Sequence, residues 1–136
     1  MKLIISSRII EELQEIAREE APSEICGLLF GRNGHVSQAQ RTRNVAENPE
    51  RHFEIDPAAL IAAERSMRDS GADIIGYFHS HPGGNIEPSV TDAEMAFPDD
   101  RIWVILNGEQ VAAWQATASG EIFNRFNPVK LDCPLD

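Results

Sequence analysis

The sequence has few cysteines, few basic residues and no long hydrophobic run, and each shortage excludes a class of protein. Two cysteines in 136 residues are too few for a disulfide framework, so we expect free thiols and a cytoplasmic protein. No apolar stretch approaches the roughly 20 residues of a membrane-spanning helix, and charge returns at Arg8, too soon for a secretory signal. The 12 basic residues against 22 acidic ones give a net charge of −10, which argues against nucleic acid as a partner.

The length and the apolar content predict one folded domain. Hydrophobic residues make up 42% of the chain, which is ordinary for a globular protein and argues against disorder. A chain of 136 residues is also large enough to bury its own core. We therefore expect a single domain over residues 1–136, in which residues 127–136 form a surface tail.

The hydrophobic periodicity predicts a mixed α/β fold. Apolar residues recur at helical spacing in two long segments and a short one, and alternate or run together in shorter segments bounded by turn residues. Asn33-Gly34 predicts a type I′ hairpin turn, and Asp56-Pro57 predicts a helix start. We expect a central, largely antiparallel sheet flanked by two long helices and a short helix. The expected helices cover about 7–20, 57–70 and 91–96, and the expected strands 2–6, 24–32, 36–45, 53–55, 73–78, 101–106, 110–116 and 121–126.

Two histidines follow the apolar, buried strand expected at residues 73–78. Because side chains alternate along a strand, His79 and His81 leave on the same face, where two imidazoles can hold one metal ion. Ser80 points the other way and is expected to be structural. The Pro-Gly-Gly sequence that follows ends the strand and allows the chain to swing back.

Asp92 can then add an oxygen ligand to the two imidazoles. Two histidines and one carboxylate, without a fourth protein ligand, are typical of a catalytic zinc site, which leaves a position for water. A structural interpretation stays open, because Ser89 to Asp92 is a capping-box pattern and so is Thr91 to Glu94. The other two histidines belong to no ligand spacing, and we expect neither His35 nor His52 to bind metal.

This segment resembles the signature of the JAMM (MPN-plus) metallopeptidases, which is His-x-His, seven residues, Ser, two residues, Asp. His79, His81, Ser89 and Asp92 fill every position. The family also needs an upstream glutamate on an early strand, and Glu24 is similar to it. The resemblance extends through most of the chain and is closest to the compact prokaryotic members. It implies a curled sheet in a cytidine-deaminase-like arrangement and one Zn²⁺ per chain held by the two histidines and the aspartate.

The resemblance also implies an activity. Glu24 would accept a proton from the attacking water and pass it to the leaving amine, and Ser89 would donate a hydrogen bond to the oxyanion. The bond cleaved would be a peptide or isopeptide bond after the C-terminal Gly-Gly of a ubiquitin-like β-grasp protein. Because this chain is short, we expect a substrate of the sulfur-carrier type, bound by strand addition near residues 46–52.

Other functions remain open at this point. The same metal site could serve a general zinc amidase without a β-grasp partner, or the chain could be a non-catalytic scaffold, although a scaffold has no physical need for an open zinc position. A nucleophilic pair of Cys26 and His79 is conceivable, but a small buried core residue is the favoured interpretation of Cys26. The zinc-deaminase signature is absent, which disfavours base deamination.

Overall fold

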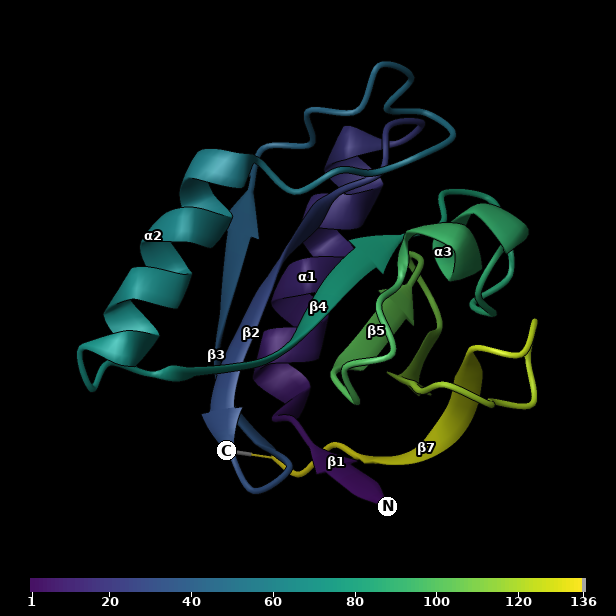
Figure 1. The fold of residues 1–136 in the computed structure, drawn as a ribbon. Helices are drawn as coiled ribbons and strands as arrows, with labels where there is room; N and C mark the ends of the chain where they lie inside the picture. The colour runs from purple at the N-terminus through teal and green to yellow at the C-terminus, as the bar shows by residue number, and fades with distance from the viewer. Residues whose placement is uncertain (136) are drawn as a thin grey trace.

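Strands from the whole length of the chain build one sheet, which the helices cover (Figure 1). The structure is a computed structural model and describes residues 1–135, and no helix within this range is long and apolar enough to cross a membrane. The strands of this range are β1 (Lys2–Ile4), β2 (Cys26–Arg32), β3 (His35–Thr42), β4 (Asp73–Ser80), β5 (Ile102–Leu106), β6 (Val111–Ala116) and β7 (Phe126–Asp132), and the helices are α1 (Ser7–Glu20), α2 (Pro57–Arg68) and α3 (Val90–Met95).

The sheet is mixed and closes on itself in the order β1-β3-β2-β4-β5-β6-β7, because β1 pairs with both β3 and β7. The pairs β2–β3, β2–β4, β5–β6 and β6–β7 are antiparallel, whereas β4–β5 and both pairs of β1 are parallel. The prediction of a mixed, largely antiparallel sheet is thus confirmed. The likeness to cytidine deaminases stays a prediction.

Capping residues mark the starts of both long helices. The hydroxyl of Ser6 accepts a hydrogen bond from the N–H of Ile9 and caps α1, and the carboxylate of Asp56 caps α2 with proline in its first turn. The predicted end of α2 at residue 70 is two residues too late. Asn33 and Gly34 have φ values of 52° and 74°, as a type I′ turn requires, so the hairpin prediction is confirmed.

Most of the predicted surface tail forms a strand. Residues 126–132 form β7, which pairs with β6 on one side and with β1 on the other, and Val129 is buried. The predicted strand at 121–126 is replaced by a turn, in which Phe123 and Asn124 both have positive φ. Pro128 lies opposite Trp114 of β6, but β1 pairs only with residues 130–132 of β7. Proline therefore has a strand neighbour on one side only, where its missing N–H is tolerated. Residue 136 of the predicted tail lies outside the described range.

One irregularity in β4 controls which side chains face the site. Leu29 of β2 lies opposite Gly76, but the next residue, Phe30, lies opposite Ile74, so that Ile75 is an extra residue in β4. Such a bulge shifts the alternation of side chains by one position. Beyond it, Phe78 points to the face covered by α1, and His79 points to the opposite face.

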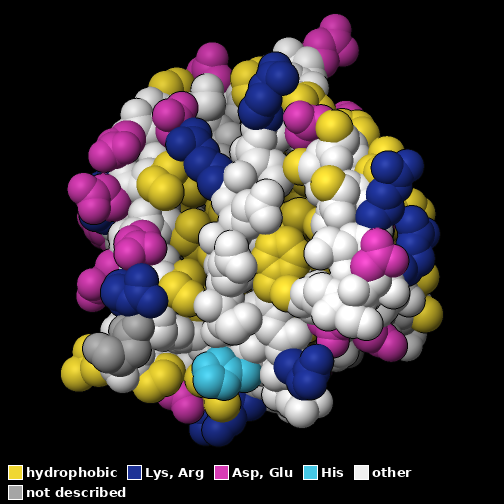
Figure 2. All heavy atoms as spheres, turned by 90° about the vertical axis from the view of Figure 1, so that its left-hand side faces the viewer, with side chains coloured by type: hydrophobic (Ala, Val, Ile, Leu, Met, Phe, Trp, Pro, Cys, Tyr) yellow, Lys and Arg dark blue, Asp and Glu magenta, His cyan; other side chains and the backbone are white. Residues whose placement is uncertain are grey.

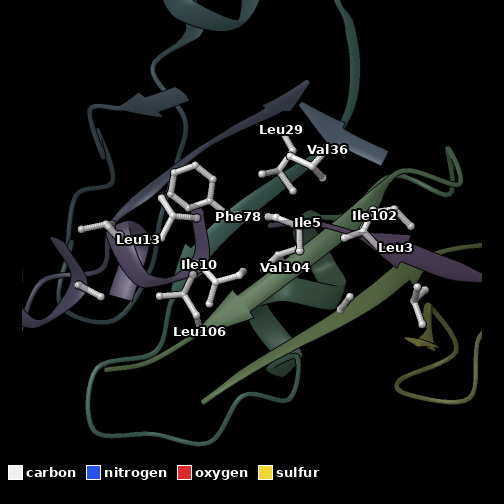
Figure 3. Packing of buried hydrophobic residues seen from close by; sticks show 14 residues of the cluster. Leu3, Ile5, Ile10, Leu13, Leu29, Val36, Phe78, Ile102, Val104 and Leu106 are labelled. Carbon is white, nitrogen blue, oxygen red and sulfur yellow. The ribbon is translucent and has the colours of Figure 1, made fainter. Parts of the chain in front are cut away.

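Helix α1 packs into one face of the curled sheet and forms the largest part of the core with it (Figures 1 and 3). Figure 3 shows Ile10 and Leu13 of α1 lying toward Phe78 and Leu106 of the strands. Fully burying side chains of this size contributes about 1.5–3 kcal/mol each. Because Phe78, the neighbour of His79, belongs to this core, the core anchors the end of β4.

The opposite face of the sheet carries α2, α3 and the loop between β3 and α2 (Figure 1). Ala63 of α2 packs with Leu28, Phe30 and Ile74, whereas Phe53 of the loop packs with Trp103 and Phe126. Figure 2 views the molecule from the side of α2 and shows apolar side chains in a hollow of this face, with charged side chains around it. The candidate site lies on this side of the sheet, at the end of β4.

Candidate metal centre and active site

Three potential metal ligands from two elements converge at the end of β4. The Nε2 atoms of His79 and His81 lie 3.0 Å apart, and the carboxylate of Asp92 in α3 lies 3.2 Å from the first and 3.1 Å from the second. His79 is fully buried and Asp92 is 4% exposed. The alternation rule correctly predicted that the two imidazoles share a face, and the structure forms a possible metal site from these three residues.

The spacing of the three groups fits a small metal ion. Ligand atoms about 2.0–2.1 Å from one zinc ion at tetrahedral corners are about 3.3 Å apart, close to the separations of 3.0–3.2 Å found here. The Nδ1 of His81 lies 2.9 Å from the main-chain oxygen of Asn85. A proton on Nδ1 donates to this oxygen and leaves the lone pair of Nε2 free for a cation.

His79 is held by aromatic rings rather than by a hydrogen bond at Nδ1. Its Nδ1 is buried and has no hydrogen-bond partner within residues 1–135. The ring of Phe53 stacks on the imidazole with a centroid distance of 4.1 Å and an interplanar angle of 20°. Trp103 meets it edge-on at 5.6 Å and 89°. The two aromatic rings therefore fix the plane of this ligand.

The protonation states suit cation binding. Burial works to raise the pKa of Asp92, but hydrogen bonds with His79, His81 and the main chain of Ser89 hold this pKa well below its usual range. Burial lowers the pKa of His79, against the opposing effect of Asp92, and so favours the neutral imidazole. For His81, burial lowers the pKa, but the carboxylate of Asp92 outweighs it and the net shift is upward. The site thus offers one carboxylate anion and a neutral, buried imidazole.

The sequence predicted Glu24 as the first residue of a strand. In the structure it lies two residues before β2. Its side chain is largely buried, and this burial raises its pKa to about 7; nearby His81 lowers the pKa and Asp92 raises it. With His81 and Ser89, Glu24 lines a cleft of about 830 Å³. A carboxyl group with a pKa near neutrality can both accept and donate a proton there.

Ser89 serves as the N-cap of α3, and the capping-box prediction is confirmed. Its hydroxyl accepts a hydrogen bond from the N–H of Asp92, whose carboxylate accepts one from the N–H of Ser89. The helix begins at Val90, so the alternative box starting at Thr91 is not used. Capping and metal binding, which the sequence presented as alternatives, are both possible for Asp92 in the same geometry.

Two irregular segments complete the cleft, and the sequence indicated only one of them. Glu50, Arg51 and His52 belong to the loop at residues 46–52, which was predicted to bind the substrate, whereas residues 121–123, in the turn before β7, were predicted as part of a strand. His52 is outside the group of three potential ligands, as predicted, but it lines the cleft. Phe53 was predicted only as the first residue of a short strand. Loop residues have no periodicity, so only the folded chain reveals that they meet at the site.

Two further predictions concern residues beside the site. Cys26 is fully buried, its sulfur lies 3.6 Å from the hydroxyl of Thr42, and its burial raises the pKa of the thiol. These properties confirm a core residue and disfavour a nucleophile. The hydroxyl of Ser80 accepts a hydrogen bond of 2.9 Å from the N–H of Ile25, which fits the structural role that the sequence predicted.

Comparison with known families defines the class of protein. Residues 6–117 match the family described as prokaryotic homologs of the JAB domain, and the chain belongs to this family. A solution structure of protein DSY2949 from Desulfitobacterium hafniense is 26% identical, with a TM-score of 0.81 over 98% of this chain and 94% of that one. A JAB1/MPN domain protein from Archaeoglobus fulgidus is 15% identical, with a TM-score of 0.58 over 97% and 99% of the two chains. The fold is therefore a mixed α/β fold of the MPN kind.

The chain is also similar to peptidases with named activities. A desampylase from Haloferax volcanii is 34% identical over 90 residues, which are 65% of each chain. A desampylase from Pyrococcus furiosus is 28% identical over 88% of this chain and 85% of that one. A probable TtuB-protein conjugate cleaving protease from Thermus thermophilus is 32% identical over 69% of this chain and 63% of that one. The chain thus spans a little under two thirds of the Haloferax and Thermus relatives.

Proposed function

We propose that this protein is a zinc metallopeptidase that hydrolyses a peptide or isopeptide bond after the C-terminal Gly-Gly of a ubiquitin-like β-grasp protein of the sulfur-carrier type. The observation that carries the proposal is the convergence of His79, His81 and Asp92 beside a cleft that also contains the buried Glu24. The relatives support the substrate class, since they include desampylases, a TtuB-conjugate protease and a CysO-cysteine peptidase.

Zinc is the proposed metal, with one ion per chain held by His79, His81 and Asp92. Two imidazoles and one carboxylate are a common ligand set of catalytic zinc, and this set leaves a position open. When bound, the ion would polarise the scissile carbonyl and lower the pKa of a water molecule to about 7.

Glu24 and Ser89 are the proposed catalytic residues. The carboxylate of Glu24 takes the proton of the attacking water and passes it to the leaving amine, which its pKa of about 7 permits. The hydroxyl oxygen of Ser89 accepts a hydrogen bond from Asp92, so its own O–H is free to donate to the oxyanion. Loss of one such donor costs about 3 kcal/mol in the transition state, or two orders of magnitude in rate.

The loop at residues 46–52 is the proposed contact for the Gly-Gly tail. Glu50, Arg51 and His52 of this loop line the cleft together with Glu24. An extended tail that pairs with this backbone would present its terminal carbonyl to the site. We expect substitution of Arg51 and His52 by alanine to raise KM, because their side chains line the cleft, and an unchanged KM would show that these side chains do not contact the tail.

The decisive experiment is cleavage of a sulfur-carrier protein that bears an amide-linked extension after its Gly-Gly terminus. Zinc-loaded wild type, chelator-treated wild type and Glu24→Ala are compared, and cleavage by the first alone is the expected result. If the protein binds one zinc per chain but cleaves only small amides, the general amidase is correct instead. If it binds no zinc and cleaves neither, the chain is a scaffold, and Ser89 and Asp92 serve only as a helix cap.

A further inference from the structure

The side chain of Asn44 uses its full hydrogen-bonding capacity within the site. Its Nδ2 donates to the main-chain oxygens of Glu24 and His52, each at 3.0 Å. Its Oδ1 accepts from the main-chain N–H groups of Ala46 and Glu54, each also at 3.0 Å. An amide offers two donor hydrogens and two acceptor lone pairs, so all four are engaged. An amide satisfied in this way holds separate segments of backbone in one geometry.

The main chain of Glu24 depends on these contacts because the sheet does not hold it. The ladder between β2 and its neighbours begins at Cys26, two residues further on. The N–H of Glu24 donates to the oxygen of Pro49 at 2.8 Å, and its oxygen accepts from Asn44. Both main-chain polar groups of the proposed base are therefore bonded to residues between β3 and α2.

Two further contacts of Asn44 lie on either side of Phe53. The oxygen of His52 and the N–H of Glu54 are bonded to the two ends of the same amide. Between them, Phe53 is buried and stacks on the imidazole of His79. The amide of Asn44 thereby connects the proposed base to the ring that supports a potential metal ligand.

We propose that Asn44 is a positioning residue that joins Glu24, the cleft-lining loop and the Phe53–His79 stack into one unit. Its amide touches neither substrate nor metal, and it acts by fixing the distance between the base and the metal centre. This proposal rests on the proposed peptidase function only for its catalytic consequence. Its structural part, that Glu24 and residues 46–54 move together, can be tested without any substrate.

The test uses Asn44→Asp, with Asn33→Asp as the matched control. Aspartate keeps the size of asparagine, but its side chain has no N–H groups to donate to the oxygens of Glu24 and His52. Asn33 is exposed in the turn between β2 and β3, where aspartate is also accepted, so the control makes the same change in charge without breaking this set of hydrogen bonds. Zinc-loaded full-length proteins are used throughout.

The first readout is amide hydrogen exchange at Glu24, measured by NMR. Its N–H is bonded to Pro49 and not to Asn44, so faster exchange in Asn44→Asp reports motion of the joined unit. We expect exchange at least about tenfold faster in Asn44→Asp and unchanged in Asn33→Asp. Unchanged exchange at Glu24 in Asn44→Asp would overturn the proposal. If this variant does not fold, the wild type decides: the amides of Glu24, Ala46 and Glu54 must open together, and independent opening of Glu24 overturns the proposal.

The second readout is the division of the kinetic effect between kcat and KM. A displaced base lowers kcat, by about 10- to 100-fold for a shift of an ångström or less, while KM changes by less than about threefold. A rise in KM with kcat unchanged would show that Asn44 shapes only the substrate contact of the loop and would overturn the positioning role. If the wild type cleaves no β-grasp substrate, the proposed function fails, and the exchange experiment alone decides this inference.

Discussion

The carboxylate of Asp92 accepts a hydrogen bond of 2.9 Å from the main-chain N–H of Ser89, while the hydroxyl of Ser89 accepts one of 3.0 Å from the N–H of Asp92. This reciprocal pair caps α3 and at the same time aims the carboxylate at the two imidazoles. A six-residue helix is too short to be stable alone, so its first turn depends on the cap. The carboxylate of Asp92 is thus part of both the helix start and the potential metal centre.

Substitution of Ser89 by alanine should therefore have two separable effects. Loss of the cap should lower the free energy of unfolding by about 1 kcal/mol, and loss of the proposed oxyanion donor should lower kcat by about 100-fold. Ser6→Ala is the matched control, because Ser6 caps α1 far from the cleft in the sequence and the fold. Chemical denaturation and steady-state kinetics of both variants separate the effects. Equal activity of the two variants would restrict Ser89 to capping.

The raised pKa of Glu24 predicts a pH-dependent difference in stability between the wild type and Glu24→Gln. The folded carboxyl has a pKa of about 7 against an ordinary value of 4.5, so the folded protein retains a proton that the unfolded chain has lost between these values. Wild-type stability should therefore fall, relative to Glu24→Gln, as the pH rises from 4.5 to 7, and stay constant above that. The full difference is about 3 kcal/mol.

Urea denaturation of the two metal-free proteins at pH 4, 6 and 8 measures this difference. We expect Glu24→Gln to gain relative to the wild type as the pH rises, because the glutamine carries no charge to bury. If the two proteins differed in free energy of unfolding by the same amount at all three pH values, the carboxyl group of Glu24 would reach solvent in the folded protein.

Phe53 should affect metal affinity beyond its contribution to the core. Phe53→Leu and Phe126→Leu remove buried rings of the same cluster, both of which pack against Trp103, and each should cost about 1–2 kcal/mol of stability. Phe53 alone of these two stacks on His79. Competition with a chromogenic chelator should give about tenfold weaker zinc binding for Phe53→Leu and wild-type binding for Phe126→Leu. Equal affinities would show that the stack does not orient the imidazole.

Zinc should stabilise the folded chain through the three converging groups. At a free zinc concentration of 100 Kd, the stabilisation is about 2.7 kcal/mol, which thermal unfolding with and without a chelator detects. His81→Gln should abolish this shift, whereas His35→Gln, at the exposed start of β3, should retain it. A shift that survives in His81→Gln would place the metal elsewhere.

The parts of the site that follow regular periodicity were predictable from the sequence. His79 and His81 share a face because a strand alternates, and Ser89 and Asp92 are three residues apart because a capping box requires it. Asn44 and Phe53 were not predicted as site residues, since they lie in irregular backbone whose course is determined by long-range hydrogen bonds. No local rule relates such residues to the end of a strand far along the chain.

The fold shows the same division between local and long-range signals. Both long helices and the first hairpin follow from caps and turn residues near them in the sequence. The last strand was placed too early because the turn before it uses Phe123 and Asn124 at positive φ, where glycine would have been the usual signal. Its pairing with β1 joins the two ends of the chain and has no local signature.

The extra residue in β4 determines which face of the sheet each following side chain of the strand points to. Ile75 is the one residue by which β4 exceeds the matching stretch of β2. Its deletion would not shorten a loop; it would turn each following side chain of the strand to the opposite side. Phe78 would then enter the cleft, and the imidazole of His79 would be forced against α1. The chemistry at the end of this strand therefore depends on a one-residue offset that has no chemical function of its own.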